Sequence, residues 1–298
     1  VTDAVLPEHR GRAFGFHRAA DTLGSILGPA TGAFLLAWLG RYLPTVSMND
    51  GTMPYRIVLG LTLVPGLLAV LSFAVLVHER RHVPNPQLRM KTALGRMPKR
   101  FRTYLAAVGL FGIGDFAPSL FIFAGTALLT MGLPADASST AATGAAAAAA
   151  GLYTLRNVVH AAVSFPAGYL ADRIGHKLPL VGGYTIGVTT VALLAASFLF
   201  GWTGIWWVGG LFCLSGVYMG VQDALERSYT GILIPRDVRG TGFGILGAVN
   251  GFGDLLSSLV VGQLWALKGP AVAFGFAACW MLAGTVVMMF VREPARQP

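Results

Sequence analysis

Apolar stretches of about 20 residues recur along almost the whole chain, and each is long enough to cross a bilayer as a helix. Charged residues make up 12% of the sequence, whereas soluble domains carry roughly 25%. Backbone groups inside hydrocarbon must be satisfied within their own segment, which favours helices. We therefore predict an all-α membrane protein with about eight spans, at 13–39, 56–77, 103–130, 145–171, 178–200, 204–232, 241–267 and 270–291.

One of these spans is duplicated. The segment RGRAFG at 10–15 returns as RGTGFG at 239–244, in each case opening an apolar, small-residue-rich stretch. The match continues in the same register over three further pairs, Ala19 with Ala248, Asp21 with Asn250 and Gly24 with Gly253. A parallel repeat of a membrane span at long spacing is typical of a two-halved secondary transporter.

The basic residues follow the connections between spans. The net charge is +9, and the region from Arg80 to Arg102 is especially rich in Lys and Arg. If successive connections alternate sides, nearly all basic connections fall on one side, which the positive-inside rule makes cytoplasmic. This pattern predicts a multi-pass protein of the cell (inner, cytoplasmic) membrane without a nucleic-acid partner. A basic surface patch for anionic partners is the alternative reading.

The basic, proline-containing segment 78–102 separates two spans from six, so we interpret it as the central cytoplasmic loop between two halves. Residues 103–298 would then form a complete second half of six helices. Residues 1–77 would be the last two helices of the first half, with the preceding helices missing. An intact eight-span protein is the alternative.

A polar segment between two spans carries the pattern G-x-x-x-D-R-x-G-x-K, formed by Gly168, Asp172, Arg173, Gly175 and Lys177. A carboxylate near a helix end can accept backbone N–H groups from the positive N-terminus of a neighbouring helix. The cations beside it can hold carboxylates of adjoining spans. A solvated loop that only fixes the topology is the simpler interpretation.

The first span is rich in glycine. Gly24, Gly28 and Gly32 are four residues apart and share one face, which allows another helix to approach closely. Pro29 removes a backbone donor and bends the helix. Together with Gly15 these residues predict a helix-packing motif.

These motifs resemble those of the major facilitator superfamily of secondary transporters. The segment from Gly168 to Lys177 is similar to the cytoplasmic-loop signature of the second half, with His176 where an Arg is usual. The glycine pattern is similar to the fifth-helix signature of proton-coupled antiporters, with Ala33 in place of a final glycine. The resemblance implies a superfamily-type helical bundle, in which this chain forms helices five to twelve of twelve.

The resemblance also implies alternating access, with two six-helix halves rocking around a central cavity. The signature loop would close the inward gate, placing Asp172 near the start of the first helix around Gly11 and Arg12. Arg173 or Lys177 would then pair with Glu226. The predicted cytoplasmic gate comprises Gly168, Asp172, Arg173, Gly175, Lys177, Asp223, Glu226, Arg227, Arg10, Gly11, Arg239 and Gly240.

Ionisable residues deep within spans are costly and therefore functional by default. Asp115 lies in the segment GIGDFAP, where glycine and proline indicate a bent or broken helix. It is our leading candidate for proton coupling because no Arg or Lys is near it in sequence. Asp21 is second, since Arg18 three residues earlier can pair with it. A structural ion pair or a residue that wets the cavity is the alternative for both.

Four further residues are candidates for the substrate cavity: Arg18, Arg156, His160 and Asp254. Arg156 suits an anionic substrate group or a carboxylate partner, and Asp254 could be that partner. His160 shares a helix face with Arg156 and titrates near neutral pH in its unperturbed form. A hydrogen-bonded histidine of the core is the alternative for His160.

No nucleotide-binding loop, zinc-binding HExxH or nucleophile elbow occurs, so we expect neither an enzyme nor a cofactor or metal site. The expected function is transport of a small molecule by a monomer in the lipid bilayer. Proton-coupled efflux of a drug or metabolite is the first hypothesis. The alternative is an importer or facilitator of a polar or anionic metabolite, through Arg18 and Arg156.

Overall fold

The computed structural model describes residues 5–42, 53–76, 95–134 and 139–293, and over these residues it is helical without strands. The elements are η1 (Pro7–His9), α1 (Arg10–Tyr42), α2 (Met53–Leu61), α3 (Leu63–Leu76), α5 (Lys99–Gly112), α6 (Pro118–Met131), α7 (Ser139–Ile174), α8 (Lys177–Phe200), α9 (Ile205–Leu233), η3 (Arg236–Val238), α10 (Arg239–Lys268) and α11 (Pro270–Met289). The prediction of an all-α architecture is confirmed.

The chain forms two compact units, and the division falls within α1. Unit 1 contains residues 1–23 and 90–298, and unit 2 contains residues 24–89. Most of the predicted central loop 78–102 lies outside the described residues, and from Lys99 onward it is the first turn of α5. The assignment of 1–77 and 103–298 to two transporter halves stays a prediction.

Five helical segments of the described residues are long and apolar enough to cross a membrane: Arg56–Leu76, Lys177–Phe200, Ile205–Leu233, Arg236–Lys268 and Pro270–Met289. The helices α1 and α7 have 33 and 36 residues, so they also have the length to span. The predicted span 56–77 is interrupted at Thr62 between α2 and α3. Pro65 explains the interruption because it cannot donate to the carbonyl of Leu61.

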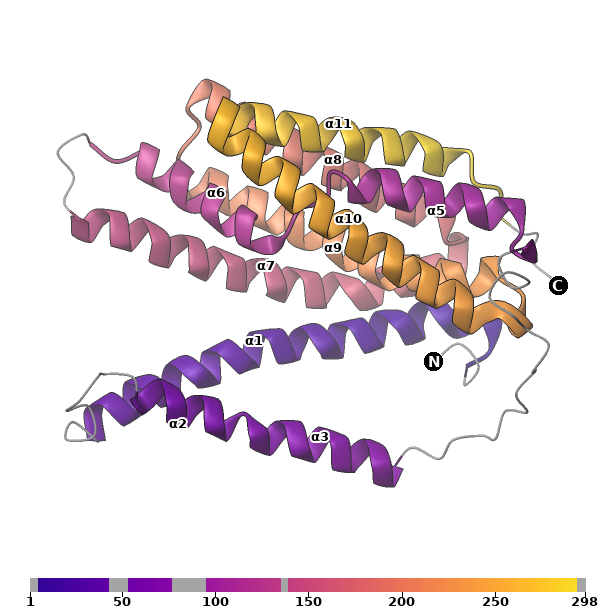
Figure 1. Ribbon diagram of the computed structural model, residues 1–298, viewed down its shortest axis with the longest axis horizontal. Helices are drawn as coiled ribbons and strands as arrows, with labels where there is room; N and C mark the ends of the chain where they lie inside the picture. The colour runs from indigo at the N-terminus through magenta and orange to yellow at the C-terminus, as the bar shows by residue number, and fades with distance from the viewer. Residues whose placement is uncertain (1–4, 43–52, 77–94, 135–138, 294–298) are drawn as a thin grey trace. The chain divides into compact units, whose positions relative to one another are not determined.

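Unit 1 is built around α9 and α11. Figure 1 shows α7, α8, α9, α10 and α11 with their axes roughly aligned. The helices α7 and α8 pack on α9, and α5, α8 and α10 pack on α11. Aromatic rings fill the space between these helices. Phe111 of α5 stacks on Tyr184 of α8 with ring centroids 3.9 Å apart. The ring centroids of Phe274 of α11 and Phe116 are 5.1 Å apart.

Glycines allow two pairs of these helices to approach closely. A Cβ at Gly284 of α11 would stand 2.7 Å from the carbonyl oxygen of Ala107 in α5. A Cβ at Gly216 of α9 would lie 2.9 Å from Cβ of Val159, and one at Gly220 would lie 2.8 Å from the carbonyl oxygen of His160. Real Cβ atoms do not occupy such positions, so the small-residue logic of membrane helices sets the α5–α11 and α7–α9 distances.

The predicted span 103–130 is two short helices, α5 and α6, separated by residues 113–117. Pro118 begins α6, where its missing N–H costs nothing. The N–H of Ala117 is satisfied by Oγ of Ser258, 3.0 Å away on α10. The prediction of a bent or broken helix around Asp115 is confirmed, and the break places this carboxyl group inside unit 1.

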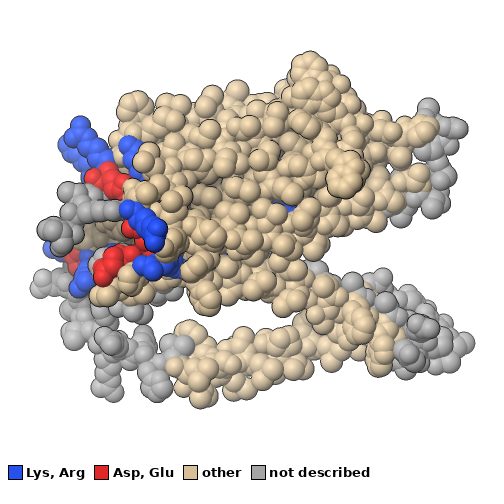
Figure 2. Space-filling view, turned by 180° about the vertical axis from the view of Figure 1, so that it is seen from behind, with Lys and Arg blue, Asp and Glu red and all other residues tan. Residues whose placement is uncertain are grey.

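Charged side chains gather at one end of the helices of unit 1, and the rest of the visible surface is almost entirely uncharged (Figure 2). We call this the charged end. By their positions in the chain, Arg96 before α5, Arg173 and Lys177 around the α7–α8 turn, and Asp237 in η3 belong to it. Arg96 and Asp237 form an ion pair there at 3.2 Å. A charged end and an uncharged flank are what a membrane-spanning bundle requires.

The close packing of α5 and α11 gives a first testable prediction. Gly284→Ala places a methyl group against backbone atoms of Phe111 and Ala107 that cannot yield, and overpacking of this kind costs about 1–3 kcal/mol. We expect a lower thermal midpoint for the full-length protein in detergent, measured by size-exclusion chromatography after heating.

Gly275→Ala on the same helix is the matched control. No described atom lies within 4 Å of a Cβ at Gly275. We therefore expect Gly275→Ala to stabilise the helix by ~1 kcal/mol, because alanine has a higher helix propensity than glycine. Equal midpoints for the two variants would contradict the packing argument.

Candidate functional site

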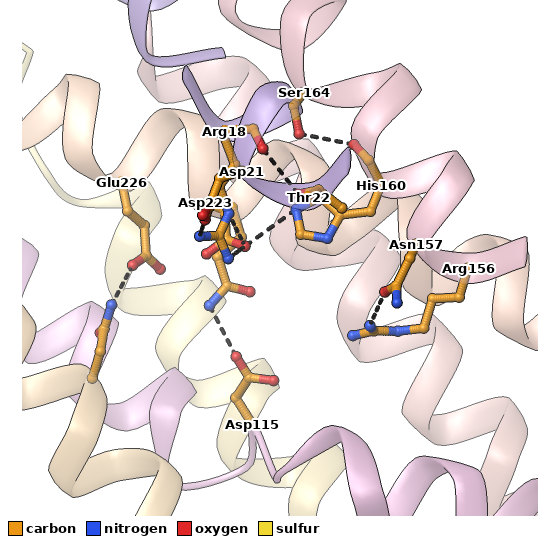
Figure 3. A network of polar contacts seen from close by, with 12 residues as sticks. Arg18, Asp21, Thr22, Asp115, Arg156, Asn157, His160, Ser164, Asp223 and Glu226 are labelled. Atoms are coloured by element: carbon orange, nitrogen blue, oxygen red, sulfur yellow. Dashed lines mark hydrogen bonds and ion pairs between the residues drawn. The ribbon is translucent and has the colours of Figure 1, made fainter. Parts of the chain in front are cut away.

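A network of polar side chains lies between α1, α7 and α9 and reaches the break between α5 and α6 (Figure 3). All of its members belong to unit 1. The residues labelled in Figure 3 are Arg18, Asp21, Thr22, Asp115, Arg156, Asn157, His160, Ser164, Asp223 and Glu226. Polar groups at this depth of a helical membrane bundle mark candidate sites for ions and substrates.

Arg18 is held by two carboxylates. Its Nη1 donates to Oδ2 of Asp21 at 2.7 Å, as the spacing of three residues predicted. Its Nε donates to Oδ2 of Asp223 at 2.8 Å, and its Nη2 donates to the same oxygen. Asp223 was expected at the gate, and the structure places it here. Arg18 is therefore neutralised within unit 1, which weakens its candidacy as a binding group for an anionic substrate.

His160 is a second basic neighbour of Asp223. Its side chain is buried, and its Nε2 lies 3.2 Å from Oδ2 of Asp223. The helix is tied locally by Ser164, whose hydroxyl donates to the carbonyl oxygen of His160 at 2.8 Å. Asp223 thus has a basic side chain on two sides, one from α1 and one from α7.

Asp115 is buried and has only neutral hydrogen-bond donors among the described residues. Gln222 Nε2 donates to its Oδ2 at 2.9 Å, and the hydroxyl of Tyr218 donates to its Oδ1 at 3.4 Å. Within the described part of the chain, no Lys, Arg or His forms an ion pair with it. This is the setting in which a buried carboxyl group can exchange a proton.

Arg156 is buried and points from α7 toward α9. Its Nε donates to Oγ of Ser215 at 2.8 Å and its Nη1 donates to Oδ1 of Asn157 at 3.3 Å. The guanidinium carbon lies 5.3 Å from the ring centroid of Tyr153. The suggested pairing with Asp254 is wrong, because Asp254 lies on an exposed face of α10 while Arg156 is turned into the α7–α9 contact.

Glu226 also has neutral partners. The hydroxyl of Tyr184 donates to its Oε1, and Nδ2 of Asn250 donates to its Oε2 at 2.8 Å. The expected pairing with Arg173 or Lys177 is wrong. Those two cations lie at the α7–α8 turn, where Lys177 donates to the carbonyl oxygen of Met289 at 2.6 Å, whereas Glu226 is buried between α8, α9 and α10.

Asp172 binds the first turn of α1. Its Oδ1 accepts from the backbone N of Gly11 at 2.7 Å, and its Oδ2 accepts from the backbone N of Arg12 at 3.0 Å and from its Nε at 3.2 Å. The placement around Gly11 and Arg12 matches the prediction. A Cβ at Gly168 would overlap the backbone of Gly11, so the two glycines allow the approach. Free N–H groups and the positive dipole end both favour a carboxylate here.

The remaining residues of the predicted gate also lie near the charged end. Arg10 and Arg239 are buried at the starts of α1 and α10, and Nη1 of Arg10 donates to the carbonyl oxygen of Gly231 at 3.4 Å. The rings of Phe14 and Phe243, which are equivalent positions of the repeat, have centroids 6.2 Å apart. Three further gate candidates differ from Arg10 and Arg239 in being exposed or stacked on a ring. Arg227 and Gly240 are exposed, and the guanidinium of Arg173 lies over the ring of Tyr169.

Gly175 directly follows the last residue of α7 and has a positive φ of 103°, a conformation that favours glycine. A carboxylate from beyond α11 covers this turn, since Oε1 of Glu293 accepts from the backbone N of His176 at 2.8 Å. Nε2 of His176 lies 2.8 Å from Oγ of Ser228 on α9. The turn is therefore fixed to its own helical bundle on two sides.

The predicted glycine motif is divided between the units. Gly15 in unit 1 packs against α7, where a Cβ would stand 3.0 Å from Cα of Phe165. In unit 2, no described atom lies within 4 Å of a Cβ at Gly24, Gly28 or Gly32. Pro29 lies within the helix α1. Within unit 1, Gly15 is thus the glycine of this motif that forms a helix contact.

Comparison with known proteins agrees with this arrangement. The model of the Major Facilitator Superfamily matches residues 1–155 and 119–298. The chain belongs to the Major Facilitator Superfamily. It is an integral multi-pass membrane protein of a transporter family, and the recognition made from the sequence motifs is confirmed.

Two relatives illustrate the similarity. An uncharacterised transporter of the superfamily type from Methanocaldococcus jannaschii is 26% identical over 292 residues, which are 98% of this chain and 66% of the relative. An uncharacterised protein of Mycobacterium tuberculosis is 24% identical over 321 residues, and the match covers 100% of this chain and 66% of the relative. The chain thus spans just under two thirds of the length of these two relatives.

A solved structure shares the fold. The chain matches a bacterial homologue of the iron transporter ferroportin in an outward-facing state, with a TM-score of 0.64 at 16% identity. The match covers 97% of this chain and 65% of that chain. At this identity the similarity supports the superfamily fold and nothing about the substrate.

The neutral members of the network were missed from the sequence. Gln222 and Tyr218 hold Asp115, Tyr184 and Asn250 hold Glu226, and Ser215 holds Arg156. Such residues are common in membrane helices and carry no sign of a site by themselves. One signal was present: Tyr218, Gln222 and Glu226 are spaced four apart, which places them on one face of a helix.

The contact between Asp172 and α1 generates a prediction. Asp172→Asn removes the charge that faces the α1 N-terminus, an interaction worth about 0.7–1.4 kcal/mol, so the contact should open about three- to tenfold more often. The measurement is the rate at which a maleimide modifies a cysteine introduced at Phe14, in a full-length background with Cys213 and Cys279 replaced by serine.

Asp237→Asn is the control, since it removes a carboxylate at the charged end whose ion pair with Arg96 is exposed. An unchanged rate in Asp172→Asn, or an equal increase in both variants, would refute a specific role for Asp172.

Proposed function

We propose that the full-length protein is a secondary transporter that moves a small molecule by alternating access, and that the described network belongs to its transport pathway. The observation that supports this is the set of charged groups placed between α1, α7 and α9, in a bundle whose flank in Figure 2 is almost entirely uncharged. A protein that only anchors or scaffolds has no need of such costly groups.

The contact of Asp172 with α1 is proposed as part of the cytoplasmic gate. Asp172 lies in the last turn of α7, and α1 belongs to the other half in the proposed arrangement. Rocking of the halves would separate the carboxylate from the N–H groups of Gly11 and Arg12. The basic charged end supports a cytoplasmic position for this gate and insertion in the cell membrane.

Proton coupling is proposed at Asp115. A carboxylate that carries protons must be buried and must be free of a permanent cation, and Asp115 meets both conditions within the described residues. Asp21 is less suited, because it forms an ion pair with Arg18. Efflux of a drug or metabolite in exchange for protons is therefore our first hypothesis, with a monomer as the working unit.

Asp115→Asn tests this coupling. The amide keeps the shape and can still bond to Gln222 and Tyr218, but it cannot release a proton. In everted vesicles from cells that express the full-length protein, we expect compound-dependent proton release to fall at least tenfold, while binding of the same compound persists.

Asp237→Asn should retain proton release, since its ion pair lies at the exposed charged end. Undiminished proton release by Asp115→Asn would return Asp115 to a purely structural role. Failure of every compound in a broad panel to release protons from the unmodified protein would reject antiport itself.

A second candidate function rests on Arg156. This guanidinium is buried, and its hydrogen bonds go to Ser215 and Asn157 rather than to a carboxylate within the described part of the chain. A buried cation held by neutral groups suits an anionic substrate. The alternative is thus an importer or facilitator of an anionic metabolite that binds at Arg156.

Arg156→Gln tests the alternative. Under that hypothesis we expect uptake of the anion in proteoliposomes to decrease at least tenfold through a raised KM, because a charge-assisted contact of about 1.5–3 kcal/mol is lost. Lys268→Gln, which changes an exposed cation at the end of α10, is the control. Equal KM values for Arg156→Gln and the unmodified protein would remove Arg156 from the binding site.

A further inference from the structure

One carboxylate oxygen is shared by two basic side chains. Oδ2 of Asp223 accepts from Nε of Arg18 at 2.8 Å and also from its Nη2, while Nε2 of His160 lies 3.2 Å from the same oxygen. The imidazole is within ion-pair distance, yet its Nε2 makes no hydrogen bond among the described residues and is buried. Arg18 already supplies two donors to this oxygen, so the two cations compete for it.

The two basic residues are attached to Asp223 in different ways. His160 and Asp223 lie on α7 and α9, whose separation is set by Gly216 and Gly220. A Cβ at Gly220 would stand 2.8 Å from the carbonyl oxygen of His160, so the two helices are in backbone contact there. Arg18 comes from α1, which belongs to the other half in the arrangement proposed above. Rocking therefore moves Arg18 away from Asp223 but leaves His160 beside it.

We propose that His160 is a proton-binding site that competes with Arg18 for Asp223, and that its protonation releases α1 from α9 and opens the charged end. This inference rests on the proposed function, because it assumes that α1 moves relative to α7 and α9. It assigns to His160 a role distinct from those of Asp115 as a proton carrier and of Arg156 as a substrate ligand.

The pairing of charges is complete in both states. When His160 is neutral, Asp223 holds Arg18, as in this structure. When His160 is protonated, a buried imidazolium needs an anion, and Asp223 is the carboxylate within reach. Arg18 is then still paired, because Asp21 lies on its own helix at 2.7 Å and travels with it. No buried charge is left without a partner, so the exchange is energetically accessible.

Charged and titratable groups face His160 from several elements. Arg18 and Asp21 lie on α1, and Asp223 and Glu226 lie on α9, where Glu226 is held by Tyr184 of α8. Arg156 lies one turn earlier on α7, and Asp115 lies at the α5–α6 break. The helix α6 has no titratable side chain, and Glu8 and His9 of η1 lie at the charged end.

The sign of the pH response follows from this competition. Histidine gains its proton as pH falls through the range of about 5–8. Acidification therefore strengthens the bond between His160 and Asp223, weakens the hold of Arg18, and opens the charged end. Alkaline conditions favour the closed arrangement described here.

The test measures conformation directly and needs no substrate. Spin labels are placed at Glu8 and Arg236, which are exposed at the charged end, in the full-length protein with Cys213 and Cys279 replaced by serine. Pulsed electron paramagnetic resonance in lipid nanodiscs gives the distance distribution at about pH 5.5 and about pH 8. The parent protein should shift toward longer distances at the acidic pH.

Three variants separate His160 from other titrating groups. His160→Gln cannot become charged, so it should keep the short distance at both pH values. His160→Arg carries a permanent charge and should give the long distance at both. His17→Gln, which changes an exposed histidine next to Arg18 on α1, should respond like the parent. Asp223→Asn removes the shared carboxylate and should also give the long distance at both, which provides a second test if His160→Gln fails to fold.

A pH-dependent shift that survives in His160→Gln, or its absence in the parent protein, would overturn the proposal. The outcome is separable from that of the proposed function. Loss of the shift in His160→Gln without any proton-coupled transport by the parent would support the switch and reject the antiporter. Proton-coupled transport by a parent whose distance change persists in His160→Gln would reject the switch alone.

Discussion

The absence of water from the hydrocarbon core is the constraint on which the whole arrangement depends, because every charge placed there needs a partner from the protein. Arg18, Asp21, Asp223 and His160 satisfy this requirement as a group rather than as isolated pairs. Asp115 and Glu226 satisfy it in another way, through neutral donors. These two solutions differ chemically: the charge of a carboxylate beside a cation is balanced by that cation, whereas neutral donors satisfy the hydrogen bonds of a carboxyl group without balancing its charge.

The features that were predictable from the sequence are those governed by a single segment. The length and hydropathy of the spans follow from local composition, and the break around Asp115 follows from its glycine and proline neighbours. The pair of Arg18 and Asp21 follows from a spacing of three residues on one helix. The contact of Asp172 with α1 was predicted differently, from a family signature, and the electrostatics of a helix end explains its geometry.

The features that were not predictable depend on how helices are rotated about their axes. Glu226 was assigned to the cations of the α7–α8 turn, but its helix presents it to Tyr184 and Asn250. Arg156 was predicted to pair with Asp254, but it donates a hydrogen bond to Ser215. All of these helices are apolar on most of their surface, so hydropathy fixes their length and leaves their rotation open. Glycines such as Gly216 and Gly220 determine that rotation only once the neighbouring helix is known.

The contact between Phe14 and Phe243 has a consequence for how a duplicated protein can change. These residues are the same position in two copies of one sequence, and they touch each other. A position that meets its own counterpart behaves like a residue on the twofold axis of a homodimer: any side chain adopted by both copies faces itself. A charge there would meet an identical charge, whereas two aromatic rings attract each other. Phenylalanine is thus compatible with both copies at once, and a charged residue could enter only if the two copies diverged together.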